Sequence, residues 1–128
     1  MRILLDTHAF LWFVWKDAKL SATALAQIVD PNNQLFLSPA NYWEVAIKVS
    51  IKKLTLSEPY TLFFKREIAQ HQITILDITV DHTDVVTTLP FHHKDPFDRL
   101  IIAQAMVEDI PVVSDDNRFD KYPITRLW

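Results

Sequence analysis

The sequence has 128 residues, of which 49% are hydrophobic, and it carries a formal net charge of −3. It has no cysteine, which excludes disulfides and thiolate metal sites, and no glycine, which excludes the glycine-rich phosphate-binding loops. The negative charge argues against binding nucleic acid through bulk positive charge, so a phosphate would have to be met by a few basic side chains or by a cation.

This length predicts one domain, residues 1–128, with a single sizeable core. No apolar run approaches the ~18 residues of a membrane span. Asp6 interrupts the short apolar run at the N-terminus, so the pattern of a signal peptide is not met. We therefore expect a cytoplasmic protein with no membrane segment.

The first predicted strand is the apolar run 2–5 (RILL), of the kind buried on both faces of a parallel sheet. Asp6 and Thr7 follow it. A carboxylate at this end of a strand lies where open α/β sheets bind ligands, but Asp is equally ordinary as a helix N-cap, and both interpretations stay open. Residues 9–15 then predict a helix. Ser21 starts a second, with Leu25, Ile28 and Val29 spaced for one buried face.

A second buried strand is predicted over 35–37, and Ser38-Pro39 has the form of a helix start. The helix that follows carries Glu44, Lys48 and Lys52 four residues apart on one face. These three side chains can form a solvated ladder worth a few tenths of a kcal/mol. Alternatively, Glu44 points inward near the strand ends and the two lysines are available to phosphates.

The next predicted elements are a helix over 59–70, a strand over 73–78 and a helix over 80–89. His71 and His82 are isolated in the sequence, and we expect both on the surface. The pair His92-His93 lacks an H-E-x-x-H pattern or a cysteine partner, which gives little reason to expect metal ligation.

The stretch HHKDPFDRLIIAQAM predicts a buried helix with an acidic start. Asp95 suits the N-cap, Pro96 the first helical position and Asp98 the positive end of the helix dipole. A strand over 110–114 follows, which ends at Asp115-Asp116. The run 124–128 closes the chain as an edge strand. Strands separated by helices throughout predict an α/β fold with a mainly parallel sheet of four to five short strands flanked by helices.

In such a sheet, the acids should meet at one edge. Asp6 and the pair Asp115-Asp116 end strands, whereas Glu44 and Asp98 begin helices, which in right-handed crossovers face the same edge. Converging acids repel one another and acquire raised pKa values unless a cation neutralises them. All-oxygen ligands select Mg²⁺ or Mn²⁺, and such an ion can activate water for attack on a phosphodiester.

The chain resembles the PIN-domain nucleases, in particular the VapC-like toxins of bacterial type II toxin–antitoxin systems. The resemblance lies in RILLDTHAFLW, SPANYWEVAIKVSIKKL, HHKDPFDRLIIAQA, VVSDDNRF and the closing RLW. It implies a three-layer PIN fold and a Mg²⁺-dependent endoribonuclease that acts on RNA, forms a homodimer and is neutralised by a cognate antitoxin.

The resemblance also assigns residues. It maps the metal-binding catalytic acids onto Asp6, Glu44, Asp98 and Asp116. Asp116 is preferred to Asp115 because the family spacing places Phe three residues after this Asp, as Phe119 stands here. Further site residues are Asp115, Ser114 and Thr7, and those expected to contact phosphate are Arg99, Lys48 and Lys52.

Three other classes of protein share some of these features. A response-regulator receiver domain also has a Mg²⁺-binding acidic pocket, but it needs an acidic pair after the first strand, whereas here the pair follows the fourth. A haloacid-dehalogenase-type phosphatase needs Asp-x-Asp after the first strand, and position 8 is His. A catalytically silent PIN binding module is the third alternative, against which the retention of all four acids argues.

Overall fold

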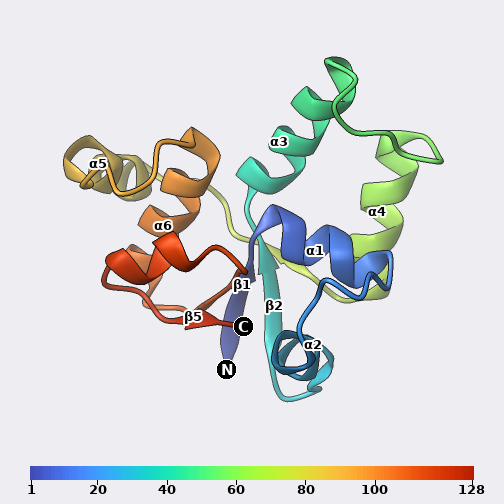
Figure 1. Ribbon diagram of the computed structural model, residues 1–128, viewed down its shortest axis with the longest axis horizontal. Helices are drawn as coiled ribbons and strands as arrows, with labels where there is room; N and C mark the ends of the chain where they lie inside the picture. Colours follow the sequence, from blue (N-terminus) through green and yellow to red (C-terminus); the bar gives the residue numbers. More distant parts are fainter.

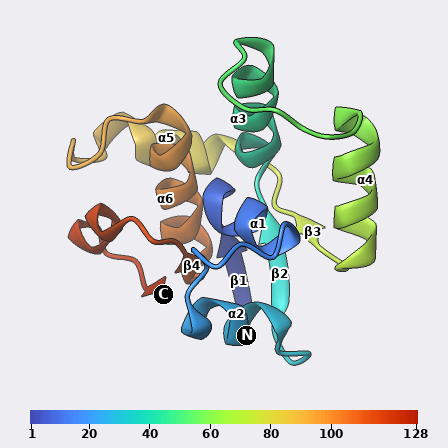
Figure 2. The ribbon, with the colours of Figure 1, turned by 45° about the vertical axis from the view of Figure 1, so that its right-hand side comes forward.

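The computed structural model describes residues 1–128 as helices packed on both faces of a five-stranded parallel sheet (Figures 1 and 2). The strand order is β3-β2-β1-β4-β5. The strands are β1 (Arg2–Leu5), β2 (Gln34–Leu37), β3 (Thr74–Ile75), β4 (Val112–Val113) and β5 (Arg126–Leu127). The predicted three-layer α/β fold with a parallel sheet is therefore confirmed.

Seven helical segments connect these strands. They are α1 (Thr7–Val14), α2 (Ala22–Val29), α3 (Pro39–Ser50), α4 (Tyr60–Gln70), α5 (Val80–Thr88), α6 (Pro96–Glu108) and the short 3₁₀ helix η1 (Asn117–Lys121). Ser21, Ser38 and Asp95 cap α2, α3 and α6 through side-chain oxygens that accept backbone N–H groups, as their sequence patterns predicted. None of the helices is both long and apolar enough to cross a membrane.

The central strand β1 divides the core into two apolar clusters, because successive side chains point to opposite faces of a sheet. Ile3 and Leu5 pack with α1, α2 and α4, whereas Leu4 packs with α6. Figures 1 and 2 show the same division, with α5 and α6 on one side of the sheet and α1, α2 and α4 on the other.

Three of the predicted strands are too long, including the one over 124–128, of which only Arg126–Leu127 form β5. The strand predicted over 73–78 is only two residues of β3, and the strand predicted over 110–114 is only two residues of β4. Strand β3 is an edge strand that pairs with β2 alone, through Thr74 and Ile75. One further backbone bond, from the Leu76 N–H to the Leu37 carbonyl, follows before the chain leaves the sheet toward α5.

Two burial predictions are wrong, and a third, for His71, holds in part. In α2 the buried side chains are Ala24 and Ile28, while Leu25 and Val29 are 43% and 58% exposed. The His82 ring is fully buried, where its Nδ1 accepts the Thr79 N–H (3.0 Å) that starts α5 and its Nε2 lies 2.9 Å from Glu108 Oε1. His71 is partly buried, with its ring centroid 4.8 Å from that of Phe13.

Candidate active site

A polar groove of about 920 Å³ lies over the carboxyl ends of the central strands. Only one of its fifteen lining residues is hydrophobic. Each of the acids singled out in the sequence contributes to its wall: Asp6, Glu44, Asp98, Asp115 and Asp116. The topology thus brings together acids from four separate elements, as expected for helices and strands that meet at one edge of a parallel sheet.

Asp6 joins β1 to α1, where it caps the helix as predicted and also lines the groove. One carboxylate oxygen accepts the Ala9 N–H at 2.8 Å and caps α1. The residue nevertheless lines the groove and is only 5% exposed. Burial, reinforced by the negative charge of Asp115, raises the pKa of Asp6 to about 7.

Glu44 points inward from the second turn of α3, as the functional interpretation required, and is 5% exposed. Its Oε1 accepts the Thr7 hydroxyl at 2.6 Å, and the Thr7 oxygen in turn accepts the Asn41 amide at 3.1 Å. Its Oε2 accepts the Lys48 ammonium at 2.7 Å. Glu44 is therefore held on both oxygens, by Thr7 on one and by Lys48 on the other.

Asp98 lies in the first turn of α6, behind the N-cap Asp95. Asp95 accepts the N–H groups of Phe97 and Asp98, which leaves the Asp98 carboxylate free of backbone donors and directed at the groove. Burial raises the pKa of Asp98 to about 8, and the charges of the neighbouring carboxylates, Asp95 first among them, add to the effect.

Asp116 behaves in the opposite way because its carboxylate is surrounded by donors. Its Oδ1 accepts the N–H and the Nε–H of Arg118 at 3.0 and 2.9 Å. Its Oδ2 lies 2.8 Å from Arg118 Nη2 and 2.7 Å from His93 Nε2. Partial burial alone would raise the pKa of Asp116, but the Arg118 and His93 hydrogen bonds outweigh it and lower the pKa to about 2.

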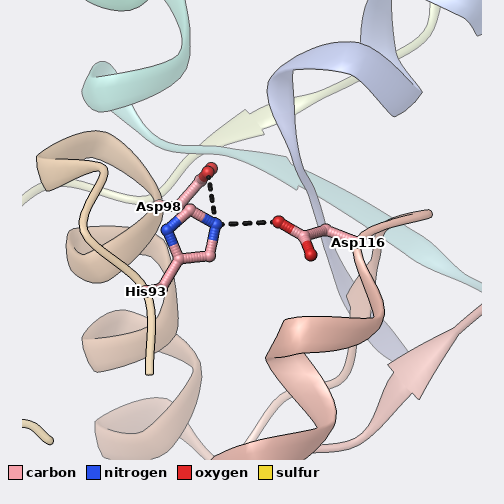
Figure 3. A group of neighbouring side chains, drawn as sticks. All are labelled: His93, Asp98 and Asp116. Atoms are coloured by element: carbon pink, nitrogen blue, oxygen red, sulfur yellow. Dashed lines mark hydrogen bonds and ion pairs between the residues drawn. The ribbon is translucent and has the colours of Figure 1, made fainter. Parts of the chain in front are cut away.

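Sequence reasoning missed His93. Its ring is buried between the two acids, with Nε2 2.7 Å from Asp116 Oδ2 and 3.1 Å from Asp98 Oδ2 (Figure 3). The sequence feature that could have pointed to His93 is its position in the chain, not a metal-binding motif. His93 stands two residues before the N-cap of α6, in the loop that must reach the same sheet edge as Asp98.

The structure contradicts one predicted phosphate contact. Arg99 is 5% exposed, and its guanidinium donates to backbone carbonyls. These include the carbonyls of Leu89, Pro90 and His93, at 2.9, 3.0 and 3.2 Å. All the strong hydrogen bonds of this side chain are thus made inside the protein, and it fixes the loop before α6.

The two predicted lysines differ. Lys52 follows the end of α3 in a left-handed turn (φ 62°) and contributes to a different hollow, with Leu54 and Tyr60, so the structure does not bring it to the groove. Lys48 lines the groove. Arg118, which the sequence reasoning did not select, lines it as well, and its side chain is 56% exposed.

The other two expected site residues have clear positions. Ser114 is fully buried, and its hydroxyl accepts the Asp116 N–H at 3.0 Å, which fixes the turn after β4. Asp115 is exposed at the wall of the groove, where it contributes negative charge.

The donor set fits a hard divalent cation. Asp6, Glu44 and Asp98 offer carboxylate oxygens to one groove, and burial together with the neighbouring acids raises the pKa values of Asp6 and Asp98. Asp116 differs, because every favourable acceptor position on its two oxygens is already taken in this arrangement.

Fold and groove together define an α/β protein with an acidic site of the kind that binds a divalent metal ion. The chain belongs to the PIN domain family, whose model matches residues 3–124. Its strand order also differs from the 2-1-3-4-5 order of receiver domains, so that alternative is wrong.

Solved structures share the fold over nearly the whole chain. VapBC2 from Rickettsia felis, bound to a DNA fragment from its promoter, is 15% identical with a TM-score of 0.70 and full coverage of both chains. VapBC-1 from nontypeable Haemophilus influenzae is 18% identical with a TM-score of 0.63, over 98% of this chain and 96% of that one. FitAcB from Neisseria gonorrhoeae is 14% identical with a TM-score of 0.58, over 97% and 95%. The search of curated proteins gives no match.

Proposed function

We propose that this protein is a Mg²⁺-dependent endoribonuclease that acts as the toxin of a type II toxin–antitoxin pair, with Mn²⁺ as an alternative ion. The observation that carries the proposal is the pair of carboxylates, Asp6 and Asp98, whose pKa values are raised to about 7 and about 8 in one polar groove. Such a pair is costly to fold without a cation, and a metal-dependent site explains why the chain keeps it.

In this proposal Asp6, Glu44 and Asp98 would hold the ion, and Asp6 and Asp98, whose pKa values are raised, would do so in their ionised forms. A Mg²⁺ ion held by these residues would supply positive charge for the phosphate oxygens and would lower the pKa of a water that attacks phosphorus. Asp116, with its lowered pKa, stays ionised throughout the physiological range and is suited to orient that water.

Two cations at the groove are placed to meet substrate phosphates. Lys48 is held at 2.7 Å by Glu44, and its side chain is 33% exposed. Arg118 is more exposed and can exchange Asp116 for a phosphate, which guanidinium groups bind in the same bidentate manner. We assign phosphate contact to Lys48 and Arg118, in place of Arg99 and Lys52.

The partner proposals rest on the resemblance and on a second surface. An apolar hollow of about 590 Å³ between α1, α2 and α4 is lined by Trp12, Phe13 and Leu20, and by the exposed Leu25 and Val29. Side chains of this kind, left uncovered in the isolated chain, suit an apolar segment of a cognate antitoxin. We also expect a homodimer, as the family resemblance implies.

The test is cleavage of RNA by the purified protein with Mg²⁺, with Mn²⁺ and with EDTA, beside the Asp98→Asn variant. We expect metal-dependent cleavage that leaves 5′-phosphate ends and is lost in Asp98→Asn. Ends carrying a 2′,3′-cyclic phosphate would refute attack by water. RNA binding without cleavage, unchanged in Asp98→Asn, would favour the catalytically silent PIN module.

A further inference from the structure

We propose that His93 is a positioning residue of the metal site, which holds Asp116 through its Nε2 hydrogen and does not itself bind the ion. The inference rests on the proposed function, because only a metal-dependent site needs these carboxylates held in place. It adds to that function a buried imidazole whose task is to fix the orientation of an acid.

The position of the ring alone suggests a different role. A ligand atom of His93, one of Asp98 and one of Asp116 all lie within 4.8 Å of one another, a spacing that could hold a metal ion (Figure 3). Imidazole nitrogen is a common ligand of transition metals, and one such ligand would bias the site away from Mg²⁺. The hydrogen bond at the other ring nitrogen decides between the two roles.

The Asp95 N–H donates to His93 Nδ1 at 3.2 Å. A backbone N–H can only donate, so Nδ1 is the acceptor and carries no hydrogen. The ring hydrogen is therefore on Nε2, where it is donated to Asp116 Oδ2 at 2.7 Å. A nitrogen that carries this hydrogen has no lone pair for a metal ion. Ligation would require the hydrogen to move to Nδ1, where it would oppose the Asp95 N–H.

The ring has no room to turn over. Its side chain is 3% exposed and packs edge-on against Phe119, with the centroids 5.8 Å apart. The His93 N–H donates to the Tyr122 hydroxyl at 2.9 Å, and the His93 carbonyl accepts from the Arg99 guanidinium at 3.2 Å. The backbone of His93 is thus fixed on both sides, and the buried Arg99 acquires a role as its support.

The contrast with Arg118 shows what His93 contributes. Both donate to Asp116, but the Arg118 side chain is 56% exposed and free to leave, whereas the His93 ring is not. Once the Arg118 side chain leaves, each oxygen of Asp116 keeps one fixed donor: His93 on Oδ2 and the Arg118 N–H on Oδ1. The carboxylate then keeps its orientation, while each oxygen regains an acceptor position for a metal ion or its water.

Two substitutions test separately the hydrogen bonds made by the two ring nitrogens of His93. In His93→Gln the side-chain amide reaches the position of Nε2 and can still donate to Asp116. In His93→Asn the shorter side chain reaches only the position of Nδ1, so it can accept the Asp95 N–H but cannot reach Asp116. Mn²⁺ is the probe, with affinity measured by calorimetry and ligand nitrogen detected by pulsed electron paramagnetic resonance.

We expect His93→Asn to weaken Mn²⁺ binding by about tenfold to 100-fold, as is usual when a hydrogen bond that orients the groups around a bound metal ion is lost, and His93→Gln to stay within about threefold of the wild type. The spectrum of Mn²⁺ bound to the wild type should contain no nitrogen coupling that is absent from the spectrum of Mn²⁺ bound to His93→Gln. Independently of any variant, ¹⁵N NMR of the wild type should show the His93 hydrogen on Nε2 both before and after Mg²⁺ is added.

The opposite results are distinguishable. A nitrogen coupling that disappears in His93→Gln, or a hydrogen that moves to Nδ1 with Mg²⁺, would make His93 a ligand and overturn the inference while the metal-dependent function stands. Equal affinities in the wild type and both variants, or equal losses in both, would also overturn it. A wild type that binds no Mn²⁺ would remove the proposed function itself, and this inference with it.

Discussion

Asp98→Asn should make the metal-free protein more stable, and increasingly so as the pH rises. The pKa of Asp98 is raised from 3.8 to about 8 in the folded protein, so the folded state retains a proton that the unfolded chain has released. The stability associated with this acid is therefore complete below about pH 4 and is lost as the pH rises toward 8. Asparagine, which resembles the protonated acid and does not titrate, removes that loss.

The size of the effect follows from the two pKa values. Each tenfold change in proton affinity is worth about 1.4 kcal/mol, so the linkage costs on the order of 4 kcal/mol at pH 7 and under 2 kcal/mol at pH 5. Because the folded carboxyl is mostly protonated below about pH 8, asparagine removes no negative charge from the first turn of α6 at these pH values, and no helix-dipole interaction is lost in return. We therefore expect a gain of about 4 kcal/mol at pH 7 and under 2 kcal/mol at pH 5.

Urea unfolding in EDTA at pH 5, 6, 7 and 8 measures these differences. Asp109→Asn is the matched control, since it makes the same chemical change at the exposed opposite end of α6. With Mg²⁺ added, the wild type should gain stability as RT ln(1 + [Mg²⁺]/Kd), about 2.7 kcal/mol at 100 times Kd, and Asp98→Asn should gain less. An Asp98→Asn variant that is less stable at every pH, with no slope, would refute the reasoning.

Three further predictions concern side chains around the groove. Arg118→Ala should raise the pKa of Asp116 above its value of about 2, which carboxyl ¹³C NMR would detect; an unchanged pKa would mean that His93 and the backbone suffice. Arg99→Met should cost about 3 kcal/mol or more in urea unfolding, because it leaves buried carbonyls without donors; normal stability combined with weaker RNA binding would restore the phosphate role instead. Thr7→Val should cost about 1–3 kcal/mol and lower RNA cleavage, since Glu44 loses its 2.6 Å hydrogen bond; unchanged cleavage would show that this bond does not orient Glu44.

The sequence predicted the arrangement of the acids because each stands next to a recognisable boundary. Asp6 ends an apolar strand and Asp98 follows a Pro at a helix start, and in a parallel α/β sheet both boundaries meet at one edge. Local patterns and one topological rule were therefore sufficient to bring these residues into one groove.

Residues whose role depends on a distant partner could not be predicted in this way. Arg99 stands beside an acid and looks like a phosphate contact, but packing of α6 against the loop before it turns the guanidinium toward backbone carbonyls. His93 looks ordinary until Asp116, 23 positions later, lies against it. In α2, the spacing of apolar residues predicted a helix, but it could not show whether Ala24 and Ile28 or Leu25 and Val29 face the core.

The shortness of the outer strands limits how this protein can assemble. The two edge strands of the sheet, β3 and β5, have only two residues each, which is too few for a partner chain to pair a strand of ordinary length with either of them. Main-chain pairing is therefore a poor route to association. In the proposed complex with an antitoxin, recognition would instead depend on side chains of the helices, such as the exposed Leu25 and Val29 of α2, so that a helix surface rather than the sheet would select the partner.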